Sequence, residues 1–239
     1  MPVSNNDVDE LARCLQAPKI HKHDAPIDKL IKHVRKVLPQ KYGSGISVVQ
    51  VVKGGSLFKG TAVVTHFDVD LVFLVDIEVD DIMKKGVLRR LKAALLDCLD
   101  DNSEVILINR REGVIFPSVS CELDGMEFDV LLGASLLGGR PTDDWSSKQL
   151  EAAQDYVLER RTYHKALNAA RSLSATVSES SVVAVRNQTD TVKLAVVLLK
   201  FWREYRELKQ FKSFFAEGIA IFAAEELRQE GQRRLTVRK

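Results

Sequence analysis

Two aspartates separated by one valine are the residues of this chain best suited to chemistry. Asp68 and Asp70 stand at the start of an apolar run, residues 71–75 (LVFLV). Side chains alternate between the two faces of a β-strand, so carboxylates at positions i and i+2 point to the same face. Two like charges in an apolar setting are costly unless a cation neutralises them. The pattern therefore predicts a divalent metal site on a largely buried strand.

A third acid lies on a later predicted strand. Residues 126–133 (MEFDVLLG) follow Asp124-Gly125, a dipeptide typical of a tight β-hairpin. If this strand lies beside the one that carries the first two acids, Asp129 completes a group of three carboxylates. Three carboxylates suit two Mg²⁺ ions, which bind carboxylate and phosphate oxygens together. One ion would hold a triphosphate and the other would activate a hydroxyl, whose proton Asp129 is placed to receive.

A glycine-rich turn precedes the first two acids. Gly54 and Gly55 allow the backbone to approach a phosphate, and Ser56 offers a hydroxyl and an N–H to it. Residues 55–61 lack the Gly-Lys-Ser/Thr sequence of a Walker P-loop, which excludes that class. An isolated D-x-D is also typical of manganese-dependent glycosyltransferases. The upstream glycine turn and the later strand acid favour nucleotidyl transfer over that alternative.

Hydrophobic periodicity predicts a two-lobed α+β chain. Helices are predicted at 26–38 (ending before Pro39), 79–100, 147–171, 189–207 and 212–231. Strands are predicted at 46–55, 62–77, 104–110, 114–123 and 126–133. The serine-rich segment 172–181 is interpreted as a linker. Because strands come first and helices later, we expect a catalytic lobe at 1–145, with an N-terminal helix, and a helical lobe at 146–239.

Composition is that of an ordinary globular protein, with 239 residues, 45% of them hydrophobic and 28% charged. No run of about 18 apolar residues occurs, which argues against a membrane span. The polar, acidic start argues against a secretory signal, and three widely spaced cysteines suit free thiols in the cytoplasm or the nucleus. The segment 19–41 carries seven Lys or Arg residues against two aspartates. A solvated helix face and a phosphate-contacting surface explain that segment equally well.

At these motifs the chain resembles the 2′-5′-oligoadenylate synthetases, within the larger group that includes cyclic GMP-AMP synthase and poly(A) polymerases. The resemblance rests on VVKGGSLFKGT, FDVDLVFL, EFDVLLGASLLGG and VKLAVVLLKFW, and it spans roughly residues 25–228. It implies a nucleotidyltransferase fold, with a small mixed β-sheet, flanking helices and a helical C-terminal lobe. ATP would bind in the cleft between the lobes. Family cores continue beyond the equivalent of Glu226, so this chain is expected to be C-terminally shortened.

The resemblance also assigns roles to single residues. Asp68, Asp70 and Asp129 match the metal-binding triad, and Gly55 and Ser56 match the phosphate-holding turn. The remaining nucleotide-binding positions implied by the resemblance are Lys200, beside the donor triphosphate, and Ser213 and Phe214, which replace a Gln-Tyr pair at the adenine pocket. Contact with double-stranded RNA is implied for Lys59, and the basic segment adds Lys29, Lys32 and Lys36 as candidates.

The leading expectation is a Mg²⁺-dependent enzyme that polymerises ATP into 2′-5′-linked oligoadenylates, in antiviral-type signalling. ATP is the expected substrate, two Mg²⁺ ions the expected cofactors, and double-stranded RNA a candidate activator that members from early-branching animals do not require. Two alternatives stay open. A cyclic-dinucleotide synthase of the same fold would differ only in how the acceptor nucleotide lies, and a non-catalytic RNA-binding protein would use the basic segment without the acids.

Overall fold

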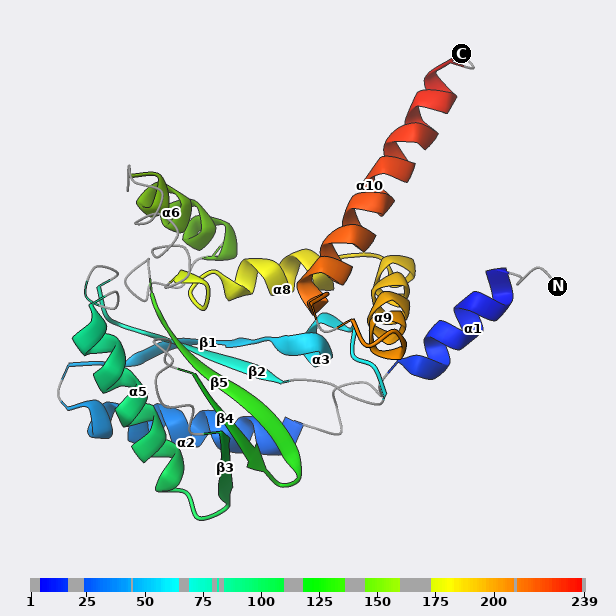
Figure 1. Ribbon diagram of the computed structural model, residues 1–239. Helices are drawn as coiled ribbons and strands as arrows, with labels where there is room; N and C mark the ends of the chain where they lie inside the picture. The colour runs from blue at the N-terminus through cyan, green and yellow to red at the C-terminus, as the bar shows by residue number, and fades with distance from the viewer. Residues whose placement is uncertain are drawn as a thin grey trace. The chain divides into compact units, whose positions relative to one another are not determined.

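The structure is a computed structural model of residues 1–239 (Figure 1). It describes residues 5–16, 24–43, 45–64, 69–78, 81, 84–109, 118–135, 145–159, 173–208 and 210–237. The chain divides into two compact units, which are described separately. The sheet unit comprises Ile20–Gly55 and Asp68–Val183, and the helical unit comprises Met1–Lys19, Ser56–Phe67 and Ala184–Lys239.

The sheet unit is built on a mixed β-sheet. Its strands are β1 (Val48–Lys53), β2 (Asp70–Val75), β3 (Val105–Asn109), β4 (Ser118–Leu123) and β5 (Met126–Ala134). Among the described residues the order across the sheet is β1-β2-β5-β4-β3. The central pair, β2 and β5, is parallel, and every other neighbouring pair is antiparallel. The expected α+β class with a small mixed sheet is confirmed.

Helices cover both faces of this sheet (Figure 1). On one face lie α2 (Asp24–Tyr42) and α5 (Lys85–Asp100), which pack against each other and against β1, β3 and β4. On the other face, Val182 of α8 (Ser178–Arg186) packs with Val52, Val72 and Leu74. The sheet unit also contains α6 (Trp145–Glu159). Apolar side chains on both faces of β2 explain why that strand is nearly all hydrophobic.

Two element boundaries differ from the sequence prediction. The first helix was predicted to end before Pro39, but α2 continues through Pro39 to Tyr42. Proline removes one backbone N–H and disturbs one hydrogen bond, which a helix tolerates close to its end. The strand predicted at 62–77 is shorter, because β2 begins only at Asp70. Asp70 therefore stands at the start of the strand rather than inside it.

The serine-rich segment 172–181 is not a linker. Leu173 is 1% exposed and Thr176 is fully buried, and α8 begins at Ser178. The hydroxyl of Thr176 accepts a hydrogen bond from the backbone N–H of Ala134 over 3.1 Å. A Cβ atom on Gly133 would lie 3.1 Å from the Thr176 nitrogen, so the glycine leaves room for this segment on the sheet. The prediction failed because the Thr176 hydroxyl satisfies a buried backbone N–H instead of meeting solvent.

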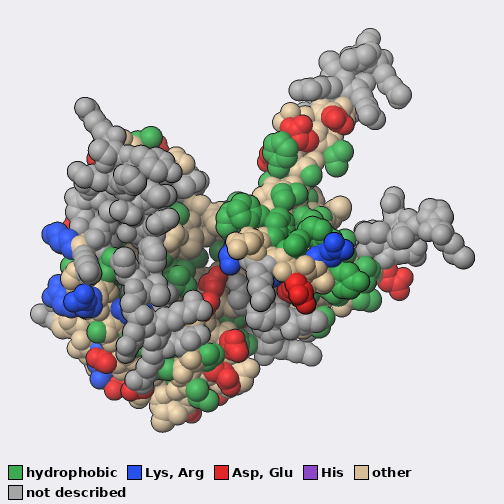
Figure 2. Space-filling view, viewed as in Figure 1, with side chains coloured by type: hydrophobic (Ala, Val, Ile, Leu, Met, Phe, Trp, Pro, Cys, Tyr) green, Lys and Arg blue, Asp and Glu red, His purple; other side chains and the backbone are tan. Residues whose placement is uncertain are grey.

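The helical unit is organised around α9 (Asp190–Tyr205) and α10 (Ser213–Val237). Val192 and Val196 of α9 pack against Ala216 and Ala220 of α10. The unit also contains α1 (Asn5–Leu15) and most of the short helix α3 (Gly55–Lys59). Figure 2 shows hydrophobic side chains gathered along α10, where Phe214, Phe215, Ile219 and Phe222 are exposed.

The division into units differs from the single boundary expected after residue 145. Helix α6 belongs to the sheet unit, and the segment from Ser56 to Phe67 belongs to the helical unit. A catalytic lobe at 1–145 and a helical lobe at 146–239 therefore stay a prediction. None of the helices in the described ranges combines the length and the apolar character that crossing a membrane requires.

Candidate active site

The site in the sheet unit begins with two aspartates on the central parallel strands. Asp70, the first residue of β2, is the register partner of Asp129 on β5, and the Asp129 N–H donates to the carbonyl of Val69 over 2.9 Å. Neighbouring strands lie about 4.8 Å apart, and register partners point to the same face. The two carboxylates therefore leave the sheet side by side, close enough to share a cation.

The exposure of these acids corrects the sequence argument. Asp70 is only partly buried, whereas the hydrophobic run predicted a buried position for it, and Asp129 is exposed. The burial pattern of β5 alternates over its first half, with Phe128 and Val130 turned into the core and Glu127 and Asp129 turned out. A solvent-facing pair costs less than a buried one and stays open to a ligand.

Ser120 holds one oxygen of Asp129. Its hydroxyl donates to Oδ1 of Asp129 over 2.6 Å, from the neighbouring strand β4. Register partners Glu122 and Glu127 lie further along the same face and add negative charge there. A donor that fixes one carboxylate oxygen orients the other one, which is how outer-shell partners serve metal ligands. The signal for this contact lies in the sequence, because a two-residue Asp124-Gly125 turn places Ser120 opposite Asp129.

Gly54 brings the end of β1 close to Asp70. Its N–H donates to the Asp70 carbonyl over 2.7 Å. A Cβ atom at this position would lie 3.2 Å from the Asp70 Cβ and 3.7 Å from Val182 Cγ2. A larger residue would require Asp70 to shift by a few tenths of an ångström. The glycine turn predicted from sequence thus ends beside the acids, and Gly55 next to it has a φ of 77°, a left-handed conformation that favours glycine.

A buried thiol lies beneath the acid pair. Cys121 is a register partner of Phe128 and points to the core side of the sheet. Burial, reinforced by the nearby charge of Asp129, raises the pKa of the Cys121 thiol to about 12. The thiol is therefore protonated at physiological pH and is a poor nucleophile.

The acid pair fits a hard divalent cation, since its donors are carboxylate oxygens on adjacent strands. Within the described residues no group of three or more potential metal ligands occurs. Asp68, the third predicted ligand, lies outside those residues. The complete triad of Asp68, Asp70 and Asp129 with two Mg²⁺ ions therefore stays a prediction.

The predicted triphosphate lysine lies in the helical unit. Lys200 is 4% exposed, and its ammonium donates to Oγ1 of Thr61 over 3.1 Å and to the Thr61 carbonyl over 3.3 Å. Glu217 Oε1 lies 3.7 Å from the same ammonium, and Glu217 Oε2 accepts a hydrogen bond from Lys59 over 2.9 Å. Sequence reasoning missed Glu217 altogether. No local pattern around it signals a contact with lysines so distant along the chain.

The remaining predicted nucleotide-binding residues also belong to this unit. Ser56 is 6% exposed and its carbonyl accepts the Thr61 N–H over 3.0 Å. Ser213 is the first residue of α10, and its hydroxyl accepts a hydrogen bond from Arg203 over 2.9 Å. Phe214 is 60% exposed. Its ring centroid is 4.1 Å from that of Phe215, which leaves an aromatic surface open to a ligand.

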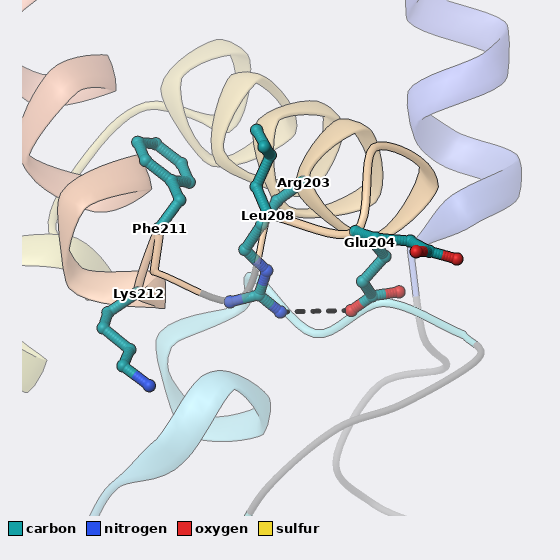
Figure 3. Close-up of a pocket in the computed structure, with 6 residues that line it drawn as sticks. Arg203, Glu204, Leu208, Phe211 and Lys212 are labelled. Atoms are coloured by element: carbon teal, nitrogen blue, oxygen red, sulfur yellow. Dashed lines mark hydrogen bonds and ion pairs between the residues drawn. The ribbon is translucent and has the colours of Figure 1, made fainter.

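A cavity of about 540 Å³ opens at the turn between α9 and α10 (Figure 3). Arg203, Glu204, Leu208, Phe211 and Lys212 line it together with Glu207. Arg203 makes an ion pair with Glu204 over 3.2 Å, drawn as a dashed line in Figure 3. The cavity thus carries both signs of charge beside an aromatic ring, directly before Ser213.

The four lysines predicted to contact RNA lie in different settings. Lys32 and Lys36 are exposed on α2. Lys29, also on α2, forms ion pairs with Glu104 and Asp124, and the hydrogen bond to Glu104 is the main cause of its raised pKa. The Lys59 side chain is only 15% exposed and is paired with Glu217. An RNA contact by these residues stays a prediction.

Comparison with known proteins gives a fold but no family. No protein-family profile matches the sequence, and no curated protein matches it. Two similar solved structures are the Escherichia coli MS115-1 CdnC in complex with HORMA-deltaN and the same CdnC with ATP. They are 16% and 17% identical to this chain, with TM-scores of 0.55 and 0.54, and cover 91% and 94% of it. This chain spans 64% and 66% of theirs, less than two thirds. The expected nucleotidyltransferase fold is confirmed.

Proposed function

We propose that this protein is a Mg²⁺-dependent nucleotidyltransferase that joins nucleotides, ATP among them, into a cyclic oligonucleotide with release of pyrophosphate. The observation that carries the proposal is the register pairing of Asp70 with Asp129, beside the glycine turn at Gly54. On a nucleotidyltransferase fold, this is an arrangement in which carboxylates can hold metal ions against a triphosphate.

The chain's own residues support each part of the transfer. An acceptor hydroxyl oxygen forms a bond to the α-phosphorus of the donor, the bond from that phosphorus to the oxygen bridging the α- and β-phosphates breaks, and the β- and γ-phosphates leave as pyrophosphate. Asp129 takes the hydroxyl proton, with Ser120 fixing its other oxygen. Asp68 and Asp70 hold the donor side, and bound Mg²⁺ supplies charge neutralisation there. Positioning and electrostatics thus account for most of the catalysis.

The cyclic product is favoured by the similar structures. CdnC is a bacterial cyclic-oligonucleotide synthase, and one of its structures was determined with ATP. A ring forms when the linear intermediate turns around in the site and its free hydroxyl attacks its own triphosphate end. This second transfer uses the same acids as the first, so it requires no further catalytic group.

Linear 2′-5′-oligoadenylate synthesis is the second candidate. The matched motifs around Gly55, Asp70, Asp129 and Lys200 favour it. Double-stranded RNA activation does not form part of the proposal, because Lys59, the RNA contact implied by that family, is held in an ion pair and largely buried.

The test is product analysis with purified protein. The protein is incubated with Mg²⁺ and ATP, alone and with GTP, CTP and UTP, with and without duplex RNA, and products are separated by chromatography. We expect pyrophosphate release and a product that resists phosphatase, because a ring has no terminal phosphate. Linkage-specific nucleases then identify its bonds. A phosphatase-sensitive ladder of adenylates would instead establish the linear product.

The matched control is Asp129→Asn. The residue is exposed, so the variant should fold like the wild type while losing all nucleotide transfer. Circular dichroism checks the fold. Turnover by this variant equal to wild type would show that the activity comes from a contaminant or from another site.

A further inference from the structure

One carboxylate in the helical unit joins three elements that the proposed function requires. Glu217 stands on α10, one helical turn after Ser213. Its two oxygens face Lys59, the last residue of α3, over 2.9 Å, and Lys200 of α9 over 3.7 Å. The sequence places predicted phosphate or base contacts on each of these elements, namely Ser56, Lys200, Ser213 and Phe214.

We propose that Glu217 and Lys59 form a buried latch that positions Lys200 and the Ser56 turn for binding the triphosphate of a nucleotide. The inference rests on the proposed function and deepens it. It assigns to Glu217 a role that the sequence did not suggest. It also makes Lys59 a positioning residue for nucleotide binding rather than a contact to RNA.

The burial of these residues indicates that the latch fixes the positions of side chains rather than adding net stability. The exposed fractions are 6% for the Glu217 side chain, 5% for Lys200 and 15% for Lys59. A buried ion pair adds little net stability, because desolvation offsets the attraction between the charges. A buried charge that loses its counter-ion is nevertheless strongly unfavourable. Glu217, Lys59 and Lys200 are therefore held in the one arrangement in which their charges are paired.

Hydrogen bonds connect Lys200 to Ser56, which lies in the predicted phosphate-binding turn. Lys200 donates to both oxygens of Thr61, which is fully buried. The Thr61 N–H donates in turn to the carbonyl of Ser56 over 3.0 Å. Movement of Glu217 therefore displaces Lys200 and Ser56 together, and α10 carries Ser213 with it.

The experiment measures ATP binding by calorimetry in the presence of Mg²⁺ and, in parallel, KM and kcat for nucleotide transfer. Four variants are compared with the full-length wild type: Glu217→Gln, Lys59→Met, the double variant of both, and Lys59→Arg. The matched control is Lys41→Met, which breaks an exposed ion pair with Asp101 of 2.6 Å in the sheet unit.

If the latch positions the binding residues, its loss should raise KM and leave kcat nearly unchanged. Glu217→Gln and Lys59→Met should each raise KM and the dissociation constant for ATP by about tenfold or more, with kcat within about threefold, because binding geometry is lost and the reacting acids are untouched. The double variant should be no worse than either single one, since both remove the same contact. Lys59→Arg, which keeps the charge, should stay within about threefold of wild type, and Lys41→Met within about twofold.

Several outcomes would overturn the latch. ATP binding by folded Lys59→Met equal to wild type would do so, as would additive losses in the double variant or equal losses in Lys59→Arg and Lys59→Met. Should Glu217→Gln fail to fold, the Lys59 series decides alone. A wild type that binds ATP but forms no product would refute the proposed function and leave the latch to be judged by binding. A wild type that does not bind ATP would refute both.

Discussion

The two units hold their charged residues in opposite ways. In the sheet unit, Asp70 and Asp129 are brought together by the backbone ladder between β2 and β5, and their carboxylates face outward. In the helical unit, Lys59 and Lys200 are brought together by the side chain of Glu217, and all three are largely buried. The positions of the two aspartates are set by the strand register, whereas those of the two lysines are set by a shared counter-ion.

This difference predicts how each group responds to substitution. Removing an outward carboxylate leaves the ladder intact, so function should be lost without loss of stability. Removing the buried counter-ion leaves ammonium groups in a poorly solvated place, so stability should be lost as well. The predictions below test this contrast, beginning with the largest expected effect.

The sharpest test of the outward acids is Asp70→Asn. We expect nucleotide transfer to fall about a thousandfold or more, because a metal ligand supplies several kcal/mol of charge stabilisation in the transition state. The midpoint of thermal unfolding should stay within about 2 °C of wild type. Product formation and calorimetry measure the two effects. A large drop in the unfolding midpoint would show that this acid is structural.

The reciprocal test is Glu217→Ala in the helical unit. We expect the free energy of unfolding to fall by about 3–5 kcal/mol, the usual cost of breaking a buried ion pair from one side. The exposed pair of Lys41 and Asp101 provides the control, and Asp101→Ala should cost under about 1 kcal/mol. Denaturant titration measures both. Equal costs for the two variants would remove the contrast between buried and exposed pairs.

A smaller effect is expected at Ser120. Its substitution by alanine removes the hydrogen bond to Asp129, and the Mg²⁺ concentration for half-maximal activity should rise by about 10- to 100-fold. Ser103→Ala, in an exposed turn before β3, should leave that concentration unchanged. Activity is titrated against Mg²⁺ for both variants. An unaltered Mg²⁺ dependence in Ser120→Ala would mean that the serine does not orient a metal ligand.

The smallest effect concerns two buried thiols of the sheet unit. Burial is the main cause that raises the pKa of Cys98 and Cys121 to about 12. In the unfolded chain these thiols ionise at their ordinary pKa, near 9.0. Between these two pKa values the unfolded state has released protons that the folded state retains. The thiols therefore add no pH dependence below pH 9 and lower the free energy of unfolding above it. The expected slope is about 1.4 kcal/mol per pH unit for each thiol.

Urea titrations at pH 8 and pH 10 measure this decline. Cys121→Ala should lose less stability than the wild type over that interval, because it lacks one of the two thiols whose pKa is raised. The same decline in both proteins would refute the assignment of the effect to this thiol.

Much of the sheet unit could be predicted from sequence because its signals are local. The Asp-Gly pair predicted the hairpin, where Asp124 adopts a φ of 53°, and with it the strand that carries Asp129. Where the prediction failed, longer-range packing decided the outcome. The serine-rich segment was assigned to solvent, yet Thr176 is buried against the end of β5.

The helical unit was less predictable for the same reason. Lys200 was identified through resemblance, but its partners Thr61 and Glu217 come from distant segments that nothing in their own neighbourhoods connects. Lys59 was assigned to RNA through the same resemblance. Only the position of α10 beside it explains why its ammonium is withdrawn from solvent.

The parallel pairing of β2 with β5 has a consequence for how quickly the protein acquires activity during folding. Its register partners are about 60 positions apart in the chain, so this ladder closes a long loop, and such non-local contacts form slowly. The hairpin of β4 and β5 involves close neighbours and should assemble much earlier. A refolding chain should therefore gain most of its β-structure before it can bind Mg²⁺, and the appearance of metal affinity would report the last step of sheet closure.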